Sequence, residues 1–159
     1  MLAGTMRSLL LLSLALAAFT VRAQVLPGGA ELGMSVPQLQ QAVPALERVP
    51  WPVRMAGGLV GSWRAATLQV AGVALMPTFF FSEGELRRVE YVADATAYDA
   101  LLAWGRATWG AELASQGSEG AYAAWTTGTT QAYLQQAAGA RPQVRLVVKR
   151  ITAKDAGEL

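Results

Sequence analysis

The candidate catalytic groups of this sequence are carboxylates and two lysines, because the chain contains no histidine and no cysteine. This composition removes Ser-His-Asp and Cys-His catalysis, thiol redox chemistry, and metal sites built on imidazole or thiolate. The lysines are Lys149 and Lys154, close to the C-terminus, and no serine motif accompanies them. We therefore expect a protein that works without a cofactor and without a metal ion.

Five glutamates are what remains for an enzyme: Glu83, Glu85, Glu90, Glu112 and Glu119. Two carboxyl groups that converge in a cleft at about 5 to 9.5 Å could hydrolyse a glycosidic bond. Glu83 and Glu85 are instead expected at a solvated turn, and Glu90 on a strand surface beside Arg88, where charge pairing serves solubility. We therefore favour a non-enzyme, with a carboxylate-based envelope glycan hydrolase as an alternative.

Two pairs of residues are candidates for contact with another protein. Trp104 lies off the apolar stripe of a predicted helix and close to Arg106, so it is either an interface anchor or covered by the first half of the chain. Arg145 and Lys149 share one face of the last predicted strand and could meet an acidic partner. For these two we favour a different explanation, the protection of an edge strand against aggregation by charge.

The N-terminus has the three parts of a secretory signal. Arg7 precedes an apolar stretch at 9–19, and small residues lie three positions and one position before Gln24. We predict cleavage after Ala23. The apolar stretch is shorter than the ~20 residues that a membrane-spanning helix needs, so we expect a periplasmic or secreted protein with no stable membrane anchor.

Loss of the signal changes the charge of the chain. The precursor has 13 lysines and arginines, 11 acidic residues and a formal net charge of +2. Arg7 and Arg22 leave with the signal, so the processed chain is neutral. A neutral chain has no overall positive potential to attract the phosphate backbone of a nucleic acid. We therefore exclude nucleic acid as a partner.

The processed chain divides into a flexible lead-in at 24–33, two similar units at 34–92 and 93–152, and a tail at 153–159. Each unit is predicted as a helix followed by three strands, in the manner of a duplicated αβββ unit. The strands are expected at 62–70, 73–81 with an interruption near Pro77, 86–92, 121–127, 129–135 and 143–151. The fold class is therefore α+β, an antiparallel sheet with helices on one face.

Local signals place the helices and the main turn. Ser35 and Gln38 form a capping box, and the first helix ends before Pro44. The second helix begins with a capping box of Thr96 and Asp99 and ends at Gly110. Other glycines, at 57, 58 and 61, predict a turn region, and Gly84 predicts a hairpin at 82–85.

The strand at 73–81 contains Phe79, Phe80 and Phe81 in succession. Consecutive side chains on a strand point to opposite faces, so these residues predict a central strand that is buried on both sides.

The helix start Gly33-Met34-Ser35-x-x-Gln38-Leu39, followed by antiparallel strands, resembles the small periplasmic modules of the BamE (SmpA/OmlA) type. The doubled arrangement resembles the beta-lactamase inhibitor protein, in which two such units present a concave sheet. The resemblance implies an α+β sandwich that binds another protein. The chain lacks the lipid-attachment cysteine of the first family and the cysteines of the second, and no contact residue is carried over.

The sequence thus favours a non-catalytic exported protein-binding module, of the inhibitor, immunity or envelope-assembly type, whose partner is an exported or envelope protein. A second hypothesis is a carrier of an apolar or aromatic small ligand, with Phe79–Phe81 and tryptophans lining its pocket. The glycan hydrolase is the third.

Overall fold

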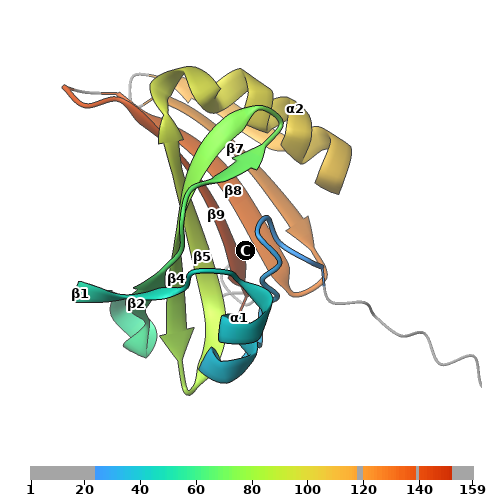
Figure 1. Cartoon of the computed structure of the whole chain (residues 1–159). Coiled ribbons are helices and arrows are strands. Elements are labelled where there is room, and N and C mark those ends of the chain that lie inside the picture. The colour runs from blue at the N-terminus through green and yellow to red at the C-terminus, as the bar shows by residue number, and fades with distance from the viewer. Residues whose placement is uncertain (1–23, 118–119, 139, 152–159) are drawn as a thin grey trace, which may run out of the picture.

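The computed structural model describes residues 24–117, 120–138 and 140–151, and shows an antiparallel sheet with two helices on one of its faces (Figure 1). The predicted signal at 1–23 and tail at 153–159 lie outside the described residues. The helical segments are α1 (Val36–Ala42), η1 (Ala56–Gly58), η2 (Ala95–Ala97) and α2 (Tyr98–Trp109). The strands are β1 (Glu47–Arg54), β2 (Val60–Arg64), β3 (Leu68–Val70), β4 (Val73–Ser82), β5 (Glu85–Asp94), β6 (Leu113–Gly117), β7 (Gly120–Thr127), β8 (Thr130–Ala137) and β9 (Gln143–Arg150).

The predicted α+β fold class is confirmed, and within the described ranges no helix has the length and apolar character to cross a membrane. The sheet has the order β1-β2-β4-β5-β9-β8-β7-β6, with β3 paired to one end of β4. In each half of the chain a helix is followed by strands, of which the first forms an edge of the sheet and the last lies at its centre. The last strands of the two halves, β5 and β9, pair with each other from Arg88↔Lys149 to Asp94↔Gln143. Whether the halves arose by duplication stays a prediction.

The core lies between the sheet and the two helices. The residues Val144, Leu146 and Val148 alternate into it from β9, as predicted, and all three are buried. The other large core side chains that are fully buried are Leu39 of α1, Leu101 of α2, Leu75 and Phe79 of β4, Leu86, Val89 and Tyr91 of β5, and Leu134 of β8. Phe80 and Phe81 are also buried, and β4 lies between β2 and β5, so the predicted central strand is confirmed.

The segment 24–33, expected as a flexible lead-in, closes the core between the helices. Leu26 and Ala30 are buried, and the Tyr91 hydroxyl donates a hydrogen bond of 3.0 Å to the carbonyl oxygen of Pro27. Burial raises the pKa of Tyr91 far above its ordinary value, so this hydroxyl keeps its proton and remains a donor. Gly33 and Met34 then exchange backbone hydrogen bonds with Leu86.

The termini of α1 follow the sequence signals. The backbone N–H of Ser35 donates to Gln38 Oε1 at 2.8 Å, and Ser35 Oγ accepts from the Gln38 N–H, which completes the capping box. The helix ends at Ala42, two residues before Pro44. The predicted end of α2 at Gly110, which has a φ of 87°, is also confirmed.

The predicted start of α2 is wrong. Asp94, not Asp99, makes the capping contact, because its carboxylate accepts from both the N–H and the hydroxyl of Thr96 at 3.0 Å. These hydrogen bonds lower the pKa of Asp94 and start the short helix η2. The helix α2 begins after it at Tyr98, without a side-chain cap.

Several strand predictions also need correction. β1 and β6 were not expected, because prolines interrupt the first and the second has little apolar alternation. The strand expected at 62–70 is two strands, β2 and β3, and Gly61 lies in β2 rather than in a turn. β4 continues through Pro77, which falls where its pairing changes from β2 to β3.

At Gly105 the helix α2 packs directly on the Trp125 ring of β7. A Cβ atom added there would lie 2.5 Å from Cη2 of Trp125. A glycine in a helix is normally less stable than alanine by about 1 kcal/mol. We expect Gly105→Ala to lower the free energy of unfolding by about 1 to 3 kcal/mol instead, because the indole must move. Urea denaturation measures whether the free energy of unfolding falls or rises. Ala107→Gly, at an exposed position of the same helix, is the control for helix propensity. An increase in stability on Gly105→Ala would contradict this packing.

Candidate functional site: the open face of the sheet

The sheet face opposite the helices is covered by no helix of the described residues, and we call it the open face. Its central cluster consists of Arg88 and Glu90 on β5, Arg145 and Lys149 on β9, Tyr133 on β8 and Tyr122 on β7. The register explains why they meet. Glu90 and Tyr133 are both cross-strand partners of Val147, and Lys149 is the partner of Arg88.

A buried ion pair lies at the centre of the open face. The Arg88 Nε donates to Glu90 Oε1 at 2.9 Å, and its Nη2 donates to both Glu90 Oε1 and the hydroxyl of Tyr133. The Arg88 and Glu90 side chains are only 13% and 10% exposed. The guanidinium thus spans the strand β9 at Val147, which is completely buried although it points away from the helices.

Aromatic rings fix this guanidinium further. The Arg88 Cζ lies 5.8 Å from the ring centroids of both Phe80 and Tyr133, within the range of cation–π attraction. Phe80 can approach because Gly61 lies beneath it, where a Cβ would be 2.6 Å from the ring. Tyr133 stacks on Tyr122 with centroids 5.9 Å apart. Burial raises the pKa of Tyr122, so this hydroxyl stays neutral beside the charged cluster.

The open face has an excess of positive charge. Glu90 is the one carboxylate of the cluster, and its second oxygen, Oε2, lies 3.9 Å from Arg145 Nε. The Arg145 side chain is nevertheless 40% exposed, and Lys149 makes no ion pair with the described residues. One negative charge therefore stands against three positive charges, of which those on Arg145 and Lys149 reach solvent.

The position of β9 overturns our explanation of these two charges. We expected Arg145 and Lys149 to protect an edge strand, but β9 is a central strand between β5 and β8. Its backbone groups are already paired on both sides, so it needs no protection. The expected pairing of Glu90 with Arg88 is present, but the role in solubility is wrong, because the Glu90 carboxylate is buried.

Trp104 and Arg106 lie on α2, on the other side of the sheet from Arg145 and Lys149. The partly buried Trp104 ring meets that of Trp109 edge to face at 5.0 Å. Arg106 is exposed and its Nε contacts both carboxylate oxygens of Glu112 at 2.9 Å, which lowers the pKa of Glu112. The fold therefore does not unite the four candidate residues in one surface.

The candidate catalytic carboxylates are dispersed. Glu83 and Glu85 lie at the β4–β5 turn, where Arg87 approaches them at 3.9 and 2.9 Å. Glu90 lies on the open face and Glu112 beside Arg106, while Glu119 is outside the described residues. Each of the four described carboxylates is within reach of an arginine, and they occupy three separate places.

Two surface pockets lie away from the central cluster of the open face. One adjoins α1 and includes Glu31, Gln38, Glu85 and Arg150; the other lies between the β3–β4 hairpin and η2. No aromatic residue lines either pocket, and Phe79, Phe80 and Phe81 are buried side chains. The aromatic lining that a ligand carrier would need is therefore absent from these two pockets.

Comparisons with protein-family models, with curated proteins and with solved structures found no match. The resemblance to periplasmic modules of the BamE and inhibitor-protein types therefore stays an expectation. The assignment of the open face as a candidate site therefore depends on its geometry alone. Sequence reasoning missed Arg88, Tyr122 and Tyr133 as members of a site, although the two-residue spacing of Arg88 and Glu90 on a strand already indicates a shared face.

The buried ion pair makes a testable prediction about stability. Glu90→Ala should lower the free energy of unfolding by about 3 kcal/mol or more, because it leaves Arg88 buried without a counter-charge. The matched control is Glu47→Ala, which removes an exposed pair with Arg64 at 3.4 Å and should cost no more than about 1 kcal/mol. Urea denaturation of the two variants measures both values; equal small losses would mean that the Arg88–Glu90 pair is solvated.

Proposed function

We propose that the processed chain is a non-catalytic protein-binding module of the periplasm or the extracellular space, and that its open face binds an exported or envelope protein through acidic side chains. The observation that carries the proposal is the ordered Arg88–Glu90–Tyr133 network, flanked by the partly exposed charges of Arg145 and Lys149. Inhibition, immunity and envelope assembly are all roles that such a contact can serve.

The composition of the open face supports this role. Arginine and tyrosine are enriched among the residues that dominate binding energy in protein interfaces. Arg88 is held by hydrogen bonds and by two rings before any partner arrives, so less side-chain freedom is lost on binding. Positive charge at the rim favours a partner with carboxylates and raises the rate at which it associates.

Export of the protein is supported by the charge, apolar stretch and small residues of segment 1–23. We expect the chain recovered from the periplasm or medium of an expressing host to begin at Gln24. Intact-mass spectrometry of the purified protein measures its N-terminus. A recovered chain that retains residues 1–23 would contradict cleavage and with it the proposed localisation.

The binding proposal can be tested by charge reversal on the open face. The processed protein is used as bait in an envelope extract, and a retained partner is identified by mass spectrometry and its affinity measured with purified proteins. Arg145→Glu/Lys149→Glu should weaken that affinity at least about tenfold, because acidic groups then face acidic groups.

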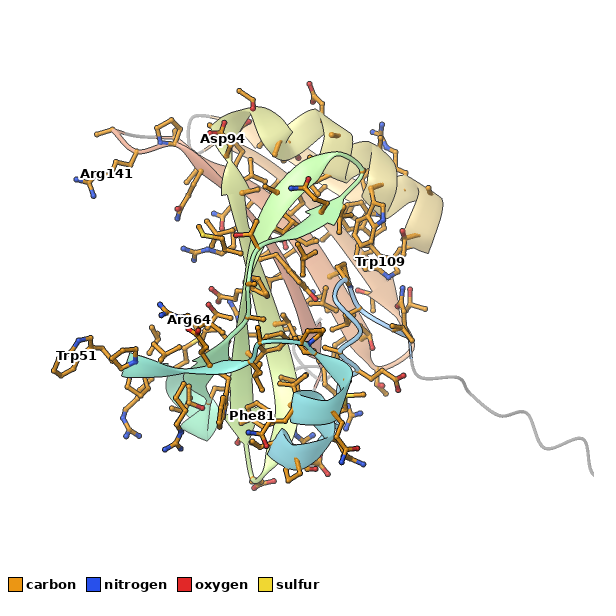
Figure 2. All side chains as sticks on the ribbon, in the orientation of Figure 1. Trp51, Arg64, Phe81, Asp94, Trp109 and Arg141 are labelled. Atoms are coloured by element: carbon orange, nitrogen blue, oxygen red, sulfur yellow. The ribbon has the colours of Figure 1, made fainter. Side chains whose placement is uncertain are left out.

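The matched control is Arg54→Glu/Arg141→Glu, which makes the same change in net charge at exposed positions outside the open face; Arg141 lies at the β8–β9 connection (Figure 2). This control should retain the partner at near-parent affinity. Equal weakening by both double variants would show that net charge alone governs binding, and no loss in the open-face variant would overturn the proposed site.

A further inference from the structure

The edge strand β1 leaves its partner over four residues. Arg48 pairs with Trp63 and Val53 pairs with Gly61, so residues 49–52 of β1 face only Ser62 of β2. These residues, Val-Pro-Trp-Pro, are an irregular stretch within β1 that we call the Trp51 bulge. The Trp51 side chain is 87% exposed and points away from the rest of the molecule (Figure 2).

This exposure is unusual because the other tryptophans of the protein are covered. Trp125 is buried, and Trp63, Trp104 and Trp109 pack against the core. A tryptophan buries 150 to 250 Å² of surface on average, so leaving Trp51 in water forgoes a large hydrophobic gain. The rigid flanking residues Pro50 and Pro52 hold the indole in this outward position.

The prolines also restrict what can bind here. An extended peptide added to the edge of a sheet needs backbone N–H groups from the edge strand. Pro50 and Pro52 have none, so the centre of β1 cannot take another strand. The same lack lowers the cost of placing the bulge in a medium of low polarity, because fewer backbone donors lose their hydrogen bonds to water.

The surroundings of the bulge are basic. Arg48, Arg54 and Arg64 lie on β1 and β2, and Glu47 is the one acidic residue of these two strands. Glu47 contacts Arg64 at 3.4 Å, while Arg48 lies over the Trp63 ring at 5.3 Å. Arg54 is exposed, and next to it Val53 is 51% exposed. The tip thus combines an exposed indole, an apolar neighbour and a net positive charge.

We propose that the Trp51 bulge docks the protein reversibly on an anionic lipid surface, with the indole at the level of the headgroups and the arginines beside lipid phosphates. Tryptophan is enriched at that depth of a bilayer, and each arginine near an anionic membrane adds attraction. A single projecting ring suits a lipid surface, which deforms around it, whereas a protein partner must supply a fitted pocket. β2 and β4 separate the bulge from β5, so docking leaves the open face free for its own partner.

Vesicle flotation of the processed protein tests the proposal. The protein should float with vesicles of phosphatidylcholine and phosphatidylglycerol and much less with phosphatidylcholine alone. Trp51→Ser should lower the partition coefficient about tenfold, and Arg48→Gln/Arg54→Gln should lower it about fivefold for each arginine near the surface. Circular dichroism checks that the variants are folded.

Leu113→Ser is the matched control, because Leu113 is 81% exposed at the opposite sheet edge, on β6. This variant should float as the parent protein does. The proposal is overturned if the parent fails to float with anionic vesicles, if Trp51→Ser floats equally well, or if Leu113→Ser is as defective as Trp51→Ser. Partner retention by the open face is measured on the same Trp51→Ser protein and should be unchanged. A failure of lipid docking is thereby distinguished from a failure of the proposed protein binding.

Discussion

The antiparallel pairing of β5 with β9 is the constraint on which the rest of the structure depends. It joins the two halves of the chain at the centre of the sheet, and its register decides which side chains meet the helices. Tyr91 and Leu146 form one cross-strand pair of the core, and Glu90 and Val147 form the adjacent pair on the open face. A slip of one residue would place Arg88 and Glu90 in the core and expose Tyr91, at a prohibitive cost in desolvation.

The same register explains how charged residues come to be buried on a face without helices. Long side chains on neighbouring strands cover one another there, and Arg88 extends over β9 to reach Tyr133. Val147 and Phe80 are sealed beneath this cover. A hydrophobic replacement of the ion pair could be as stable, so stability alone does not account for the choice of Arg88 and Glu90. Their fixed geometry, with charge left over at Arg145 and Lys149, suits recognition.

The sheet edges and the sheet face pose different physical problems. A strand edge exposes unpaired backbone groups, and β1 removes part of that exposure with Pro50 and Pro52. The bulge that results presents Trp51 outward. The same prolines that prevent backbone pairing at this edge therefore leave a side chain available for contact. The open face has no free backbone groups on its central strands, and its contacts can be made only by side chains. The two surfaces therefore suit partners of different chemistry, a lipid interface and an acidic protein.

The sequence by itself determined the features that depend on neighbours along the chain. The capping box of Ser35, the stop at Gly110 and the positive φ of 77° at Gly84 all follow from a few adjacent residues. The exclusion of histidine and cysteine chemistry follows from composition alone. Only the tertiary structure decided that β9 is central, that Glu90 is buried, and that Trp104 and Arg145 lie on opposite sides. These properties depend on which strands pair, and pairing is set by burial across the whole sheet rather than by any local pattern.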